Sequence, residues 1–233
     1  MKLNYAAICS SALLALAAAA APAFAGPLMW NFYSLGGSPT SNKNLGVTST
    51  TFTQGTESLT TTSMMWNSST STWGSGNGDL VIKAGGSAEE EGMGLSNDPY
   101  PIGSSTSNDE IAYPNGIEVS GFSGHVSDVM IGSIQGTSTN GESWAVYGSN
   151  NGSSWTQLGS GMGGLTESFN SASLMDYSHL IISDPSSTPY TNSNDVVLMS
   201  VTTVPEPGTL ALFAAGLLGC ALLAARRRRA RQR

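Results

Sequence analysis

The chain has little cysteine, and the little that it has lies close to its two ends. Both cysteines, Cys9 and Cys220, fall inside apolar stretches, so the region from Gly26 to Thr203 contains none. Disulfide bonds and thiolate chemistry are therefore excluded from that region.

Basic residues are almost as scarce between the two ends. Only Lys43 and Lys83 lie between residues 26 and 204, against fifteen of the sixteen acidic residues, which leaves this part with a net charge near −13. Nucleic acids and anionic membrane surfaces need cationic patches on their partners. The composition therefore argues against nucleic acid as a partner and favours an exported protein with an anionic surface.

Recognisable catalytic motifs are missing as well. His125 and His179 are the only histidines, neither has a metal-ligand spacing, and no GxSxG motif accompanies them. A pair of Asp or Glu residues across a cleft can hydrolyse a glycoside, but nothing in the sequence selects such a pair. We predict no catalytic residues and no enzyme activity, and we keep a secreted polysaccharide hydrolase as an alternative.

The first 25 residues have the order of a secretory signal peptide. Lys2 precedes a long apolar stretch, and Ala23 and Ala25 place small side chains where signal peptidase requires them. We therefore predict an N-terminal signal helix, removed by signal peptidase so that Gly26 becomes the first residue.

The last 30 residues combine three features in a fixed order. Pro205 and Pro207 hold Glu206 in extended backbone. Residues 208–225 carry no charge and are just long enough for a transmembrane helix. Clustered arginines stay on the cytoplasmic side of a membrane and so place the body outside; they are Arg226, Arg227, Arg228, Arg229, Arg231 and Arg233.

Val204, Pro205, Glu206 and Pro207, followed by the apolar helix and the Arg cluster, resemble the PEP-CTERM sorting signal. The resemblance covers residues 204–233. It implies recognition by exosortase, a membrane-embedded processing enzyme of Gram-negative bacteria that make extracellular polysaccharide. It also implies an inner-membrane intermediate with a cytoplasmic Arg tail, and then delivery of the body to the outer surface or the extracellular matrix.

Residues 26–203 have the pattern of a single all-β domain. Short runs of β-branched and aromatic residues alternate with Gly, Pro, Asn and Ser, which predicts an antiparallel β-sandwich or jelly-roll-like ectodomain. The predicted strands are LMWNFY (28–33), DLVIK (79–83), GIEVSGF (116–122), VSDVMIGSI (126–134), SWAVYG (143–148), SWTQLG (154–159), SHLIIS (178–183) and DVVLMSV (195–201).

A β-hairpin is predicted between two of these runs. Trp144 and Val146 are expected on one face of the first strand, with Tyr147 on the other, and Asn151 and Gly152 supply the turn. Residues 149–155 also resemble the Asp-box of sialidases, with Asn151 in place of the Asp. The box is a structural turn, so its Trp155 is expected to pack in the core.

A looser resemblance extends over most of the body. The matching positions are similar to a recurrent β-sandwich ectodomain of PEP-CTERM proteins, and the hairpin is similar to galactose-binding-like and discoidin-like sandwiches. Those sandwiches commonly bind glycans or surfaces. The positions are Gly94, Leu95, Asn108, Asp109, Glu110, Ile111, Glu118 and Phe122.

Two kinds of ligand site are candidates in the body. Asp109 and Glu110 are hard oxygen donors in turn-rich sequence, which suits Ca²⁺, although ordinary turn and cross-strand roles are the alternative. No other cofactor is predicted. Trp66 and Trp73 lie in a polar, loop-like stretch from Met64 to Asp79 and are expected to be exposed. We predict glycan contacts at these two tryptophans and at Asn151, the alternative being that the tryptophans cap the core.

The leading functional hypothesis combines the two terminal signals with the anionic body. It is a non-enzymatic protein of the cell surface or biofilm matrix, with a structural or adhesive role associated with extracellular polysaccharide. A glycan-binding module, calcium-dependent or not, is the alternative.

Overall fold

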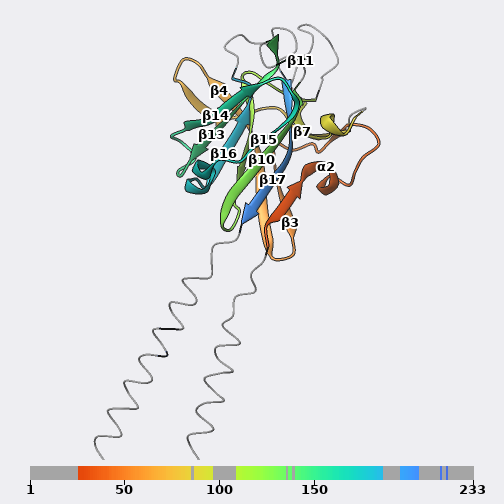
Figure 1. Ribbon diagram of the computed structural model, residues 1–233. Coiled ribbons are helices and arrows are strands. Elements are labelled where there is room, and N and C mark those ends of the chain that lie inside the picture. Colours follow the sequence, from red (N-terminus) through yellow and green to blue (C-terminus); the bar gives the residue numbers. More distant parts are fainter. Residues whose placement is uncertain are drawn as a thin grey trace, which may run out of the picture. The chain divides into compact units, whose positions relative to one another are not determined.

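Apolar side chains at alternate positions build two antiparallel sheets around one core (Figure 1). The computed structural model describes residues 26–84, 87–96, 109–134, 136–137, 140–185 and 195–204, with residues 216 and 219 of the C-terminal segment. Pro27–Val204 forms one compact unit, called the body below.

The elements follow one another along the body as short strands with few helical turns. In chain order they are β1 (Leu28–Asn31), α2 (Phe32–Leu35), β2 (Lys43–Asn44), β3 (Ser49–Gln54), β4 (Glu57–Asn67), β5 (Thr72–Ser75), β6 (Leu80–Lys83), the 3-10 helix η1 (Ala88–Glu90), β7 (Gly92–Leu95), β8 (Ile111–Ala112), β9 (Asn115–Ser120), β10 (His125–Ile134), β11 (Gly136–Thr137), β12 (Asn140–Gly141), β13 (Ser143–Ser149), β14 (Thr156–Met162), β15 (Leu165–Phe169), the 3-10 helix η2 (Ala172–Asp176), β16 (His179–Ser183) and β17 (Asp195–Val204).

The strands pair into two large sheets. The eight-stranded sheet has the order β15-β10-β17-β7-β6-β2, with β1 and β8 also paired to β17. The seven-stranded sheet has the order β14-β13-β16-β9-β4-β3, with β5 paired to β4, and β11 and β12 form a small separate ladder. The predicted all-β class is thereby confirmed.

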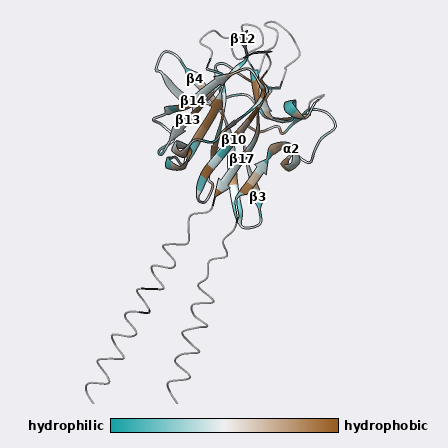
Figure 2. Ribbon diagram, in the orientation of Figure 1, coloured by the Kyte–Doolittle hydropathy of each residue, from teal (hydrophilic) through white to brown (hydrophobic). Residues whose placement is uncertain are grey.

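The core lies between the two sheets. Val129 and Ile131 of β10 and Leu180 and Ile182 of β16 are fully buried in the same cluster, although they come from different sheets. Figure 2 shows hydrophobic residues concentrated along strands such as β10 and β13, with hydrophilic residues in the hairpin loops. Every residue of the described hydrophobic clusters belongs to the body. Residues 26–204 therefore contain both clusters in full.

Strand β17 runs from one end of the body to the other. Leu28 of β1 lies opposite Thr203, and the indole Nε1 of the fully buried Trp30 donates to Thr203 Oγ1 at 3.2 Å. At the other end of β17, Asp195 lies opposite Ala112 of β8. Ten residues of strand span about 30 Å. The first and last residues of the body therefore lie far from the loop that follows β8.

One predicted strand is shorter than its hydrophobic run. The run 28–33 ends as a strand at Asn31, whose side-chain Oδ1 accepts a hydrogen bond from Ser34 N at 2.9 Å and caps α2. Asn is a preferred N-cap because its side chain satisfies an otherwise unpaired backbone donor. Phe32 therefore enters the core from a helical turn.

The stretch from Met64 to Asp79, which was expected to be loop-like, contains a β-hairpin. Strands β4 and β5 pair with Trp66 directly opposite Trp73, and the Asn67 side chain accepts hydrogen bonds from the backbone of the connecting turn. The expectation was wrong because the Ser and Thr residues around these tryptophans resemble a loop in composition. The cross-strand contact between the two tryptophans stabilises the hairpin, and composition alone does not reveal such a contact.

The hairpin predicted between 143 and 159 is confirmed. Strands β13 and β14 pair antiparallel, and Gly152 has φ +66° in the connecting loop. The Asn151 Oδ1 accepts hydrogen bonds from the backbone N–H groups of Ser153 and Ser154, both at 2.9 Å. The turn therefore combines a glycine in the left-handed region with an Asn side chain that mimics a backbone turn.

We predict that Gly152→Ala lowers the free energy of unfolding by about 1 kcal/mol, because an L side chain at positive φ is strained. Gly74→Ala in β5 is the matched control, since a Cβ there has open space and no positive φ. Urea denaturation of both variants checks this. Equal stabilities for the two variants would contradict it.

Candidate ligand-binding site

A second hydrophobic cluster covers the outer face of the seven-stranded sheet. Alternation along β16 buries Leu180 and Ile182 in the main core and directs Ile181 to the opposite face. There Ile181 packs with Met64 of β4 and Trp73 of β5, and Trp66, Tyr147 and Trp155 pack against their margin. The sheet therefore has apolar side chains on both faces.

Trp73 lies at the centre of this aromatic layer. Its ring centroid is 5.5 Å from that of Trp66 and 5.7 Å from that of Tyr147, with interplanar angles of 61° and 62°. Such edge-to-face contacts are the favoured geometry of aromatic pairs. A Cβ on Gly116 of β9 would lie 3.0 Å from the Trp73 ring and 2.9 Å from Ile181 Cγ2, so the glycine makes room for the indole.

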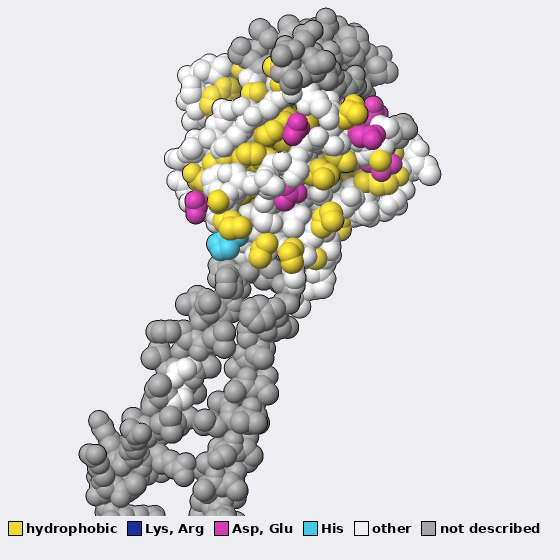
Figure 3. All heavy atoms as spheres, in the orientation of Figure 1, with side chains coloured by type: hydrophobic (Ala, Val, Ile, Leu, Met, Phe, Trp, Pro, Cys, Tyr) yellow, Lys and Arg dark blue, Asp and Glu magenta, His cyan; other side chains and the backbone are white. Residues whose placement is uncertain are grey.

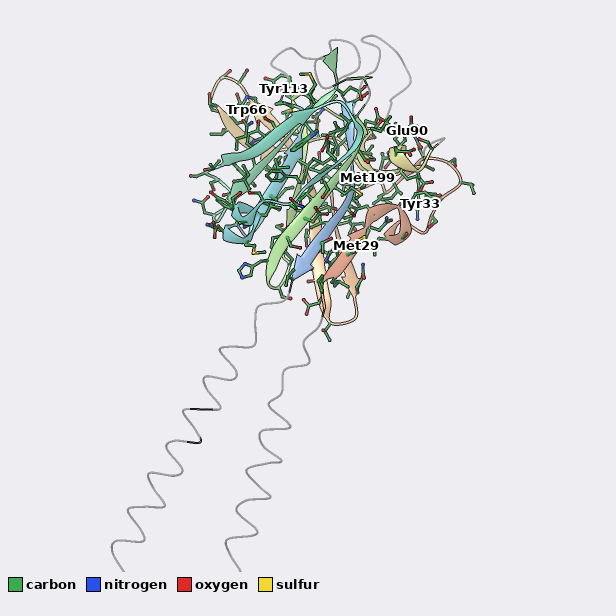
Figure 4. All side chains as sticks on the ribbon, in the orientation of Figure 1. Met29, Tyr33, Trp66, Glu90, Tyr113 and Met199 are labelled. Carbon is green, nitrogen blue, oxygen red and sulfur yellow. The ribbon has the colours of Figure 1, made fainter. Side chains whose placement is uncertain are left out.

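A pocket of about 200 Å³ opens beside these rings. It is lined by Trp66, Trp73, Tyr113, Tyr147, Ser183, Asp184 and Pro185, and we call it the aromatic pocket. Figure 4 shows Trp66 and Tyr113 at the same end of the body, opposite the end where Met29 lies.

The polar side of the aromatic pocket comes from the end of β16. Ser183 and Asp184 are both buried; the Ser183 hydroxyl donates to Asn115 O at 2.9 Å, and Ser143 Oγ donates to Asp184 Oδ1 at 3.2 Å. Burial, followed by the nearby charge of Asp184 and by Tyr113, raises the pKa of the Tyr147 phenol. The Asp184 carboxylate therefore acts electrostatically on the aromatic wall.

The structure brings both predicted glycan tryptophans into this pocket but corrects their exposure. Trp66 is half-buried and Trp73 is only 8% exposed. Trp73 is covered because it packs between Trp66 and Tyr147 over Gly116. Asn151 is exposed in the β13–β14 loop and is not among the residues that line the pocket.

Five pocket residues were not predicted from the sequence: Tyr113, Tyr147, Ser183, Asp184 and Pro185. The alternation in β13 placed Tyr147 on the face opposite Val146, and this pattern was the signal that could have identified Tyr147 as a pocket residue. Tyr113 and Asp184 follow the ends of β8 and β16, strands that are far apart in sequence. Only the pairing of β16 with β9 brings those two chain segments together.

Trp155 and His179 lie on the same outer face but outside the pocket lining. Their rings meet edge to face at 6.5 Å, and His179 Nδ1 is 2.6 Å from Glu118 Oε1. Trp155 is half-buried against the second cluster. It was expected to pack in the core, but it packs on the outer face of the sheet and not between the two sheets.

The two residues predicted to bind calcium have different partners. Asp109 has φ +60°, and its Oδ2 accepts a hydrogen bond from Asn42 Nδ2 at 2.9 Å. Glu110 is 1% exposed and forms an ion pair with Lys83 and a hydrogen bond with Ser133. In the described parts of the chain, no group of three or more His, Cys, Asp or Glu side chains is placed to hold a metal ion. Calcium at Asp109 and Glu110 stays a prediction.

Glu110 belongs to a buried ionisable group inside the eight-stranded sheet. Burial, together with hydrogen bonding and repulsion from Asp195, raises the pKa of Glu110 to about 8, although Lys83 acts in the opposite direction. Two carboxylates close together cannot both ionise easily. Lys83 is therefore balanced by a Glu110 and Asp195 pair that retains a proton at neutral pH.

The sorting residues lie mostly beyond the described part of the chain. Gly26 is exposed at the start of the body, and Val204 ends β17 opposite His125. Ala23, Ala25, Pro205, Glu206, Pro207, Arg226, Arg227, Arg228 and Arg229 lie outside the described residues, as does Asn108.

No helix within the described ranges has the length and apolar character needed to cross a bilayer. Of the predicted transmembrane segment, residues 208–225, only residues 216 and 219 are described.

Comparison with known families confirms the sorting signal. Residues 203–229 match the PEP-CTERM protein-sorting motif. The chain is therefore an exported protein that an exosortase processes at the membrane. No curated protein and no solved structure matches the chain.

We predict that replacing Pro205, Glu206 and Pro207 by alanine abolishes processing, because alanines remove the extended backbone that presents Glu206. Immunoblotting of cell fractions with a tag in the body measures the loss of the shortened form. Gly74→Ala, a substitution in strand β5 of the body and outside the matched residues, is the control. Normal processing of the Pro205 to Pro207 variant would contradict the prediction.

A second prediction concerns Glu110. Its folded pKa of about 8 lies above the ordinary value of 4.5, so its contribution to stability is complete below pH 4.5 and is lost as the pH rises through about 8. Glu110→Gln keeps the neutral form at every pH. We expect the native protein to lose stability between about pH 5 and pH 9 relative to this variant.

Chemical denaturation of both proteins at several pH values checks this second prediction. All other ionisable groups are common to both proteins, so the difference between the two stability curves isolates Glu110. Asp176→Asn, at an exposed carboxyl, is the control. Parallel curves for native protein and Glu110→Gln would refute the prediction.

Proposed function

We propose that the body is a non-enzymatic glycan-binding module that associates with extracellular polysaccharide through the aromatic pocket. The sequence of events begins with removal of the signal peptide by signal peptidase. It continues through an inner-membrane intermediate with a cytoplasmic Arg tail and ends at the outer surface or in the matrix. In that setting the module has an adhesive role.

The composition of the aromatic pocket carries this proposal. Ligand sites are concave and mostly apolar, with a few polar groups that fix orientation. Here two tryptophans and two tyrosines form the walls, and Ser183 and Asp184 supply the polar groups. Trp and Tyr offer a rigid apolar face together with a polar tip, which suits a sugar because a pyranose has apolar C–H faces and a polar rim.

Binding is favoured over hydrolysis by the acidic residues of the pocket. Glycoside hydrolysis uses two carboxyl groups that flank the scissile bond. The pocket lining contains one, Asp184. The His179 ring is held against Glu118 and Trp155, outside this lining.

The position of the pocket also fits an adhesive role. Tyr113 follows β8, which pairs with the start of β17, whereas Leu28 pairs near its finish. The aromatic pocket therefore lies at the opposite end of the body from its two chain ends (Figure 4).

We predict that Trp66→Ala weakens binding of the body, residues 26–204, to extracellular polysaccharide from the producing organism at least tenfold, or about 1.4 kcal/mol. Trp66 is half-buried at the pocket, so its loss removes a wall without opening the main core. Isothermal titration calorimetry measures the affinity.

Trp155→Ala is the matched control for this measurement. Trp155 is also half-buried on the same face but does not line the pocket. Native protein that fails to bind, or Trp66→Ala protein that binds as tightly as Trp155→Ala protein, would overturn the proposal.

A further inference from the structure

The charge around the aromatic pocket indicates which kind of glycan it accepts. This inference rests on the proposed function. The body has two basic side chains, Lys43 and Lys83, and both lie in the eight-stranded sheet. Lys43 Nζ donates to Gly36 O at 3.0 Å, and Lys83 pairs with Glu110. The seven-stranded sheet that carries the aromatic pocket has no Lys or Arg in its strands.

The charge of the pocket itself is negative. Asp184 is one of its lining residues and is 2% exposed, so its carboxylate is weakly screened by water. Its proximity contributes to the raised pKa of the Tyr147 phenol, after the larger effect of burial. The face of the body in front of β10 and β17, which Figure 3 shows, likewise has acidic and hydrophobic side chains and no described Lys or Arg side chain. A carboxylated or sulfated sugar would meet repulsion from Asp184 at the pocket.

The arrangement of the rings also favours some ligand groups over others. Trp66 and Tyr147 are inclined by 61° and 62° to Trp73, so the three rings make an angled wall and not a flat platform. A flat pyranose lies against only one ring of such a wall. A rounded ammonium group can approach several ring faces at once, and aromatic faces attract cations within about 6 Å, Trp most strongly.

We propose that the aromatic pocket recognises the protonated amine of an amino sugar, and that the glycan partner therefore contains deacetylated hexosamine units. The ammonium group lies against Trp66, Trp73 and Tyr147, and Asp184 balances its charge. The hydroxyl groups of the same sugar face Ser183. N-acetylation removes the positive charge and adds bulk, so an acetylated unit binds weakly.

The experiment compares two trisaccharides of the same linkage, one of glucosamine and one of N-acetylglucosamine. Each is titrated into the body, residues 26–204, at an ionic strength of about 0.15 M, where attraction between distant exposed charges is largely screened. We expect the glucosamine trimer to bind at least tenfold more tightly.

Two variants separate the pocket from the general acidity of the body. Trp66→Leu leaves the net charge unchanged and removes one aromatic face, so it is expected to reduce glucosamine affinity about tenfold, whereas Trp155→Leu is not. Asp184→Asn is expected to reduce glucosamine affinity and leave binding of the acetylated trimer unchanged. Asp176→Asn removes the same charge at an exposed position outside the pocket and serves as its control.

The possible results separate this inference from the proposed function. Equal binding of both trimers that is lost in Trp66→Leu overturns the ammonium preference and retains a glycan site. Glucosamine binding unaffected by Trp66→Leu overturns the inference as well, because the attraction is then to the acidic surface as a whole. A lysine peptide that competes as strongly as glucosamine overturns the choice of a sugar. If Asp184→Asn fails to fold in thermal unfolding, the Trp66→Leu comparison decides alone.

Discussion

Backbone pairing along β17 is the constraint on which the rest of the body depends. Four strands bond to this one strand, namely β1, β7, β8 and β10. It is also the last strand of the body, and the matched sorting motif begins within it at Thr203. The eight-stranded sheet therefore cannot close until the chain up to Val204 is present. Its long-range pairings are of the kind that slow folding.

The seven-stranded sheet carries the proposed site because two sets of apolar side chains cover its outer face. Residues that alternate away from the core create an apolar layer, and the β4–β5 hairpin folds Trp73 onto that layer above Gly116. The pocket is what remains between this covering and the segment after β16. Its properties follow from the hairpin and not from any single reactive group.

The sequence predicted the features that depend on local pattern. Alternating apolar residues indicated the strands of the core, and Asn151 with Gly152 indicated the β13–β14 turn. It did not predict β3 and β4, because Thr and Ser are frequent in both strands and because the partner that places this hairpin in the sheet, β9, lies far along the chain from β4. Trp66 and Trp73 were recognised as ligand candidates, but the burial of Trp73 depends on Tyr147 and Gly116, which no local pattern connects to it. Asp184 was missed for the same reason: its role depends on which strands lie beside β16.

The orientation of β17 has a mechanical consequence. A ligand held at the aromatic pocket and a chain held beyond Val204 would pull on the body from opposite ends of this strand. The pull then runs along β17, while its hydrogen bonds to β10 lie across that direction. Under such a load the bonds are sheared together and share the force, whereas strands pulled apart sideways lose them one after another. A body pulled in this way would stay folded until several of these hydrogen bonds break at once.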